Sequence, residues 1–215
     1  MWPKKLFRSK RGIVGVEAAI VLIAFLIIAA ALSYVVINMG FYTTQKTKET
    51  MQTGLDESLT ALQLDGVVTA KTNESSSHIL YLLVPVKLSA GRGAVDLGND
   101  SVVVSVYLPN ATLMNIYKGA KVTTDTTWDA LIQTLGLNDN EAKFAIYNDN
   151  GYENTVLESN EKAFLLIRLN STNADGMLGE YASVKIEVRT AKGAALTVVR
   201  TAPGGLNQNC FVDLG

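Results

Sequence analysis

The sequence has almost none of the residues that build disulfides, zinc sites and histidine-dependent active sites. Cys210 is the only cysteine, so an intrachain disulfide is excluded and stability must come from packing, assembly or glycans. His78 is the only histidine, which leaves neither a zinc-ligand cluster nor a Ser-His-Asp set to argue for. A glycine-rich phosphate loop is also missing. We therefore expect no catalytic residues, no cofactor, no metal site and no enzymatic activity.

The N-terminal region contains cations, then one carboxylate, then a long apolar run. The run from Ala18 to Ile37 is almost wholly apolar and follows Glu17. About 20 residues at about 1.5 Å each can cross roughly 30 Å of hydrocarbon. Five cations precede the run, and this basic flank places the N-terminus in the cytoplasm and the rest of the chain outside. The cations are Lys4, Lys5, Arg8, Lys10 and Arg11.

The order of these features differs from that of an ordinary secretory signal peptide. Such a peptide has an apolar core of about 7–15 residues and a small-residue cleavage site after the core. Here the small residue, Gly12, precedes the core, and no A-x-A-like site follows it. We expect residues 1–12 to be a leader that is cut between Gly12 and Ile13, so that the apolar helix stays with the mature chain.

Loss of this leader would make the mature protein acidic. The full chain has a formal net charge of -1, and all five leader cations would leave with residues 1–12. An acidic surface argues against a nucleic-acid partner. If the leader instead stays attached, the chain is a single-pass membrane-anchored extracellular binding protein. N-terminal sequencing separates these two hypotheses.

Residues 13–63 are predicted to form one long helix of about 50 residues, because they lack proline and contain few glycines. The second half is polar but keeps an apolar stripe on one helical face. This stripe packs either on the protein's own β domain or on a neighbouring subunit. Asp65-Gly66 is predicted to end the helix. The stripe consists of Met51, Leu55, Leu59 and Leu62.

Residues 66–215 are predicted to form a β-rich domain. Short runs of β-branched and aromatic residues alternate with turn signals, and Ser183–Arg189 shows clear period-2 alternation. One short helix is predicted at Trp128–Leu135. The fold class is therefore α+β, one long N-terminal helix followed by an immunoglobulin-like β-sandwich. Predicted strands are Val67–Lys71, His78–Ser89, Ser101–Leu108, Ala142–Asn148, Lys162–Asn170, Ser183–Ala191, Ala194–Ala202 and Gln208–Leu214.

The two ends of the chain resemble a known family. Lys10-Arg11-Gly12 before Ile13-Val14-Gly15-Val16-Glu17 and an apolar helix is similar to the class III signal peptide of type IV pilin-like proteins. Within that superfamily the chain looks most like an archaeal flagellin (archaellin). The run Val36–Lys46 and the C-terminal segment Leu196–Gly215 support this narrower resemblance.

The resemblance implies a structural subunit of the archaeal flagellum (archaellum), serving swimming motility and also surface adhesion. A prepilin-type signal peptidase would cut the membrane-inserted precursor. A membrane assembly platform with an ATPase would then stack identical or sister subunits into an extracellular helical filament. Helices would form its core and β domains its outer wall. An adhesive archaeal type IV pilin is the nearest alternative.

Glu17 is the one carboxylate beside the apolar run. A carboxylate buried without a partner costs several kcal/mol. Cleavage after Gly12 would create a positive α-amine on Ile13, and Glu17 of a neighbouring subunit would then pair with it. The alternative is that Glu17 is simply favoured near a helix N-terminus by the macrodipole.

Four N-x-[ST] sequons lie in the part predicted to be external, and glycosylation requires such exposure. We expect at least two of them to carry glycan. Their asparagines are Asn73, Asn99, Asn110 and Asn170.

Overall fold

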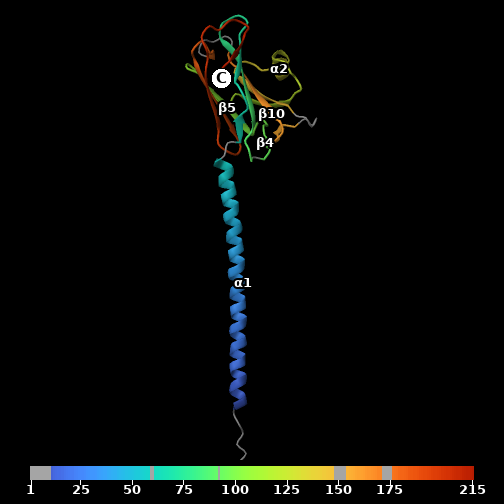
Figure 1. Ribbon diagram of the computed structural model, residues 1–215, viewed down its shortest axis with the longest axis vertical. Coiled ribbons are helices and arrows are strands. Elements are labelled where there is room, and N and C mark those ends of the chain that lie inside the picture. The colour runs from blue at the N-terminus through green and yellow to red at the C-terminus, as the bar shows by residue number, and fades with distance from the viewer. Residues whose placement is uncertain (1–10, 59–60, 92, 148–153, 171–175) are drawn as a thin grey trace, which may run out of the picture. The chain divides into compact units, whose positions relative to one another are not determined.

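The computed structural model describes residues 11–58, 61–91, 93–147, 154–170 and 176–215 (Figure 1). The chain divides into two compact units, Met1–Gly54 and Leu55–Gly215. The predicted class, a long helix followed by a β-sandwich, is confirmed. In chain order the elements are α1 (Arg11–Ser58), β1 (Leu62–Leu64), β2 (Thr69–Thr72), β3 (Ile79–Leu88), β4 (Val95–Asp96), β5 (Val102–Tyr107), β6 (Thr112–Leu113), β7 (Tyr117–Val122), α2 (Trp128–Leu135), β8 (Glu141–Tyr147), β9 (Val156–Leu157), β10 (Lys162–Arg168), β11 (Ser183–Thr190), β12 (Leu196–Thr201) and β13 (Phe211–Asp213).

The larger sheet has the order β13-β2-β3-β10-β8-β7, and β1 also pairs with β3. β10 lies at its centre, where Leu165 stands opposite Val84 of β3 and Phe144 of β8. All pairs are antiparallel except β7 with β8, which run parallel. A parallel pair needs a crossover connection, and α2 supplies it between these two strands.

The smaller sheet has the order β12-β11-β5-β6 and is antiparallel throughout. The alternation predicted for β11 is confirmed, because Val184, Ile186 and Val188 are buried while Ser183 and Lys185 are exposed. A sheet with one face on the core shows this period of two.

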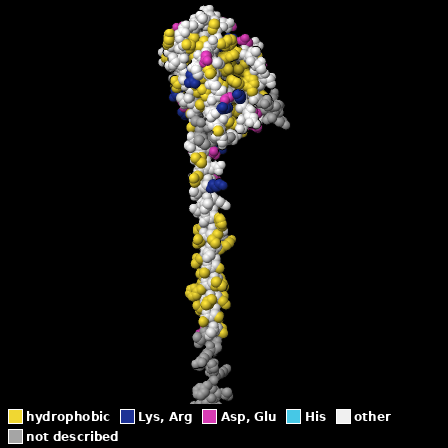
Figure 2. All heavy atoms as spheres, in the orientation of Figure 1, with side chains coloured by type: hydrophobic (Ala, Val, Ile, Leu, Met, Phe, Trp, Pro, Cys, Tyr) yellow, Lys and Arg dark blue, Asp and Glu magenta, His cyan; other side chains and the backbone are white. Residues whose placement is uncertain are grey.

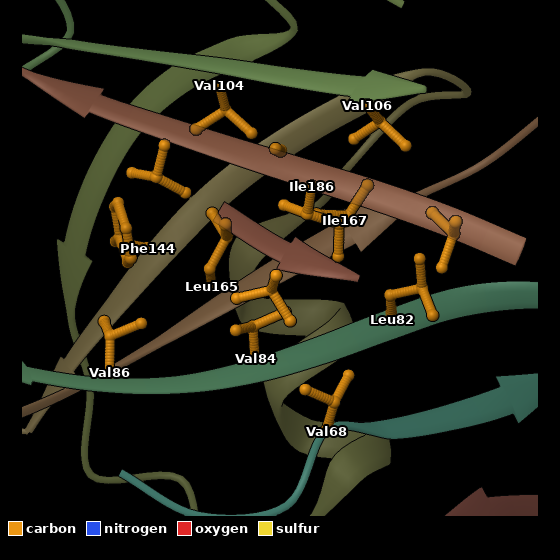
Figure 3. Close-up of a cluster of buried hydrophobic side chains, with 14 of the residues drawn as sticks. Val68, Leu82, Val84, Val86, Val104, Val106, Phe144, Leu165, Ile167 and Ile186 are labelled. Atoms are coloured by element: carbon orange, nitrogen blue, oxygen red, sulfur yellow. The ribbon is translucent and has the colours of Figure 1, made fainter. Parts of the chain in front are cut away.

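Both sheets contribute to one apolar core (Figure 3). Val104 and Ile186 come from the smaller sheet, and Leu82, Phe144 and Leu165 come from the larger one. Each of these five side chains has no more than trace exposure to solvent. Burial of each such side chain contributes about 1.5–3 kcal/mol, so the core is the main stabilising feature of the domain.

Helix α2 covers the outer face of the larger sheet. Its Leu131 and Leu135 are buried against Ala145 of β8 and Leu166 of β10. Thr127 caps the helix, since its side chain accepts a hydrogen bond from Ala130 N. The helix ends at Gly136 in the left-handed region. The predicted helix Trp128–Leu135 is thereby confirmed.

Two carboxylates tie loops to the sheets. Asp65 lies 2.6 Å from Lys87 Nζ and 3.0 Å from Lys162 Nζ, and these hydrogen bonds lower the pKa of Asp65. Asp96 accepts hydrogen bonds from the Ser101 hydroxyl, from Gly98 N and from Thr155. The Ser101 bond contributes most to lowering the pKa of Asp96.

The predicted end of the long helix was wrong. α1 ends at Ser58 instead of residue 63, and residues 59–60, including Leu59, lie outside the described ones. Leu62 is 2% exposed and stands opposite Leu88 of β3, so it belongs to a strand and not to a helical stripe. Asp65-Gly66 therefore follows β1 and does not stop the helix. Cross-strand pairing and burial override the helical periodicity here.

All eight predicted strands contain an observed strand, with ends shifted by at most three residues. Five strands were missed: β1, β4, β6, β7 and β9. Four of these are only two or three residues long. β7 is longer, but its Lys118, Gly119 and Lys121 hide the usual strand pattern.

Candidate functional site

The candidate functional site is the apolar part of α1. Every described side chain of α1, from Gly15 to Ser58, is exposed. Figure 2 shows apolar side chains along this helix, with charged ones gathered toward its C-terminal end. Among the exposed residues, Leu22 and Phe25 are each 69% accessible and Val35 is 51% accessible. Side chains of this kind contribute about 1.5–3 kcal/mol each when removed from water, so the helix requires a covering partner.

The covering partner must surround the helix, because the exposed apolar residues do not keep to one face. An amphipathic surface helix would show a single apolar stripe, whereas a helix that is apolar all round is buried in a membrane or a large core. Among the described residues, Gly15–Ser58 includes one stretch long and apolar enough to cross a membrane, with a mean hydropathy of 3.0. Lipid and a bundle of like helices both satisfy this requirement.

Most hydroxyl side chains of α1 are satisfied within the helix itself. Ser33, inside the apolar run, donates to Ala29 O at 2.8 Å, so its hydroxyl does not need an external partner. Further along, five threonine hydroxyls donate to the carbonyl oxygen four residues earlier. They belong to Thr43, Thr44, Thr47, Thr50 and Thr53. The helix can therefore enter an apolar environment with few unpaired hydroxyls.

Glu17 has no such partner. It lies near the start of α1 and is exposed, and within the described residues it makes no hydrogen bond or ion pair. Gly12 and Ile13 lie in the first turn of α1, although their side chains are outside the described ones. Ile13 precedes Glu17 by four residues, about 6 Å along the helix axis. The structure thus brings the predicted junction and the carboxylate to the same end of one helix.

The sequons occupy two kinds of position. Asn99 and Asn110 are exposed, in the turn before β5 and in the turn between β5 and β6. Asn73 is half-buried, and its backbone is bonded to His78 and Asn209. Asn170 is half-buried after β10, and the next two residues of its sequon lie outside the described ones.

The sequence of the chain matches a family model over most of its length. The model for archaeal-type flagellin covers residues 12–200. The chain is 42% identical to "Probable flagellin 1" of Aeropyrum pernix over 211 residues, which is 97% of this chain and 100% of that protein. The chain belongs to the archaeal-type flagellin family. "Probable flagellin 2" of Archaeoglobus fulgidus is 34% identical over 97% of this chain and 98% of that one.

Solved structures agree with this flagellin's fold. The crystal structure of archaeal flagellin FlaB1 from Methanocaldococcus jannaschii matches with a TM-score of 0.58 at 19% identity, covering 71% of this chain and 95% of that one. The archaeal flagellum of Methanospirillum hungatei strain JF1 matches with a TM-score of 0.54 at 24% identity, covering 93% and 98%. At these identities the likeness concerns the fold alone.

Sequence reasoning missed one surface feature of this flagellin. Tyr181 is 76% exposed and adopts φ 57, in the left-handed region that a bulky residue rarely occupies. It sits just before β11, and nothing in the local sequence distinguishes it from an ordinary turn residue. The positive φ angle of Tyr181 is therefore known only from the structure.

Proposed function

We propose that this flagellin is a structural subunit of an archaeal flagellum filament, and that it polymerises through α1 to serve swimming. One observation carries the proposal: a folded β domain is continuous with a helix whose apolar side chains are exposed all round. Such a helix is stable only when other apolar surface encloses it. In a filament, copies of the same helix would provide that surface and the β domains would form the outer wall.

The subunit would reach the filament through a membrane-inserted precursor. The basic leader keeps the N-terminus in the cytoplasm, and α1 crosses the bilayer. A prepilin-type signal peptidase then cuts between Gly12 and Ile13 and removes residues 1–12. The mature subunit is then extracellular and acidic.

Glu17 supplies the electrostatic part of assembly. In the filament core its carboxylate would pair with the α-amine of Ile13 on a neighbouring subunit. An ion pair with good geometry offsets the desolvation of both charges, whereas either charge alone would cost several kcal/mol. The lack of any partner for Glu17 within the described residues leaves the carboxylate available for this contact.

Assembly needs an external source of work. The apolar side chains of α1 are already removed from water in the bilayer, so transfer into a helical core brings little further hydrophobic gain. We infer that an ATPase acting through a membrane assembly platform extracts the subunit.

The outer wall would carry glycan. Asn99 and Asn110 are the favoured acceptors, because both lie on exposed turns where an enzyme can reach the amide. Intact-mass measurement of the mature subunit tests this, since a mass equal to that of the bare polypeptide contradicts it.

Electron microscopy and N-terminal sequencing of the purified extracellular fraction test the proposal as a whole. We expect filaments whose main protein begins at Ile13. A main product that begins at Met1 and stays in the membrane fraction would overturn the proposal, because an uncut chain is an anchored protein.

A further inference from the structure

The turn that carries Asn110 lies at the rim of a groove. The β5–β6 hairpin closes through Pro109 and Asn110, and Leu108 N donates to Ala111 O at 2.8 Å across the turn. Pro109 lines a shallow groove of about 550 Å³ at this end of the smaller sheet. A group attached to Asn110, which is exposed, therefore begins beside the groove. We call it the hairpin groove; its lining includes Tyr107, Pro109, Glu180, Tyr181, Ser183 and Lys185.

An aromatic ring stands next to the sequon of Asn110. Tyr107 of β5 pairs directly with Thr112 of β6, which is the third residue of the sequon. Residues that face each other in an antiparallel pair project their side chains from the same face of the sheet. Lys185 of β11 pairs with Tyr107 on the other side, and its Nζ lies 5.1 Å from the centroid of the ring. Tyr107 therefore lies between a lysine and the threonine of a glycosylation sequon.

Tyr181 brings a second ring to the hairpin groove at a conformational cost. It is 76% exposed and adopts φ 57, and its N–H donates to Ala202 O beside the β11–β12 pair. Its ring lies over Gly204, where a Cβ atom would overlap the Tyr181 hydroxyl. An exposed ring adds little to the stability of the free domain, and strained conformations of this kind are concentrated at ligand sites. Tyr181 therefore has the properties of a binding residue.

The polar groups of the hairpin groove suit a ligand that is rich in hydroxyls and has no net charge. Lys185 and Glu180 are the one cation and the one carboxylate of its described lining. Glu180 is exposed and uses Oε1 to accept from Leu206 N at 2.9 Å, which leaves its second oxygen as an acceptor. Ser183 shares a hydrogen bond of 3.0 Å with the Thr201 hydroxyl. Because the charges balance, neither a phosphate nor a charged peptide is favoured.

Sugars have this combination of properties. One face of a pyranose ring presents C–H groups, which pack on the electron-rich face of a tyrosine ring. The hydroxyls at its rim donate to carboxylates and accept from ammonium and hydroxyl groups. In the hairpin groove the two tyrosines supply the rings, and Glu180, Ser183 and Lys185 supply the polar partners.

We propose that the hairpin groove binds the proximal sugars of a glycan carried by Asn110 of the same chain. The inference rests on the proposed function and deepens it, because it gives one of the two favoured glycan sites a binding surface. A sugar tethered at the rim has a high effective concentration at the groove, so contacts that are individually weak still form. The bound sugars would cover both rings and join the β5–β6 turn to β11, which would stabilise the β domain.

The coupling between Asn110 and the two rings tests the proposal. In cells that express each variant as their single flagellin, Asn110→Gln removes the glycan and should lower the unfolding temperature of the detergent-dispersed subunit by about 2–4 °C. In a chain that also contains Tyr107→Thr and Tyr181→Gly, the same change should have little effect. Both tyrosine substitutions suit their backbone, since threonine favours a strand and glycine accepts φ 57. The double-mutant cycle removes the cost of losing each ring by itself.

Two control variants separate the sugar from the asparagine. Thr112→Val destroys the sequon but keeps Asn110 and a β-branched residue in β6, so it should lower the unfolding temperature as much as Asn110→Gln does. Asn99→Gln removes the other exposed sequon, which lies in a turn outside the lining of the hairpin groove. The effect of Asn99→Gln should be the same with and without the two rings.

The outcomes separate this inference from the proposed function. If the unaltered chain forms no filaments, the proposed function fails, whereas the coupling measured on subunits still decides the inference. Peptide mass mapping that finds Asn110 without glycan overturns the inference and leaves filament assembly untouched. If Asn110 carries glycan but its removal costs the same with and without the rings, the glycan does not bind the groove. If Tyr181→Gly lowers the dissociation temperature of filaments equally in the Asn110→Gln background, the groove contacts a neighbouring copy and the inference is again overturned.

Discussion

Replacing Phe144 by alanine is expected to destabilise the β domain by about 3–5 kcal/mol. Phe144 is 0% exposed and lies on β8, opposite Leu165 of β10 and Ala120 of β7. Its ring meets that of Tyr117 edge-on, with centroids 5.6 Å apart. The loss combines the transfer free energy of the ring, the cavity left between two sheets that cannot close fully, and an aromatic contact of about 0.5–1.5 kcal/mol.

The expected loss of stability is large relative to the total stability of the domain. A domain of this size is typically stable by about 5–15 kcal/mol, so one substitution should remove a substantial part of that stability. The unfolding temperature should fall by roughly 6–20 °C. Thermal and denaturant unfolding of the mature subunit in detergent, followed by the fluorescence of Trp128, measures both quantities.

Two further variants make the measurement interpretable. Phe144→Leu keeps most of the side-chain volume. Like other volume-conserving exchanges in a core, it should lower the stability of the domain by less than about 1.5 kcal/mol. Met114→Ala, at a side chain that is 70% exposed, should change stability by no more than about 0.5 kcal/mol. A loss below about 1 kcal/mol for Phe144→Ala would refute the reasoning, because it would mean that the two sheets close over the vacated site.

Three more outcomes are expected. Asp65 and Asp96 have pKa values below that of an unfolded aspartate. The stability they contribute is therefore present above about pH 4 and is lost as the pH falls through their folded pKa values. In the Asp65→Asn, Asp96→Asn double variant, the free energy of unfolding should depend less on pH in that window, as measured by acid titration. Gly136→Ala should cost about 1 kcal/mol by denaturant unfolding, because Gly136 ends α2 at φ 52. Glu17→Gln should leave cleavage intact but lower filament yield, and normal filament number and length would rule out the intersubunit ion pair.

Local sequence predicted those elements whose pattern is set by one buried face. The alternation in Ser183–Arg189 reappears in β11, and the apolar spacing in Trp128–Leu135 reappears in α2 with its cap at Thr127. Val184, Ile186 and Val188 of β11 and Leu131 and Leu135 of α2 are buried, whereas the outward Glu187 is buried as well. Helical and strand periodicities are local properties of the sequence. In these two segments no distant strand pairing overrides them.

Sequence reasoning failed where distant pairing decides the structure. The helical stripe continues through Leu62, yet pairing with Leu88 makes that residue part of a strand. β7 could not be recognised because its partner β8 lies beyond α2, and its own Lys118 and Gly119 weaken the strand pattern. Parallel pairing through a crossover leaves no short-range signal comparable to a hairpin turn.

The candidate site divides in the same way. The length and apolar character of α1 could be read from the sequence, because a helix that is apolar all round needs no tertiary information to be identified. The exposed apolar side chains of the smaller sheet could not be predicted from the sequence. Val103 pairs with Arg189 and Val199 pairs with Lys185, so these distant residues come onto one sheet only through β11. Tyr181 adopts a backbone conformation that the local sequence does not indicate.

The helix α1 and the β domain have different energetic roles in the proposed filament. Enclosure of α1 exchanges one apolar environment for another, so it fixes the helix in place without favouring strongly one arrangement of neighbours. Contacts between outer domains instead remove surface from water, and the charged and aromatic groups in such contacts are directional. Selection of a single helical lattice should therefore depend on the outer domains. Substitutions on α1 should change how much filament forms, and substitutions on the exposed faces of the β domain should change how regular and how heat-resistant it is.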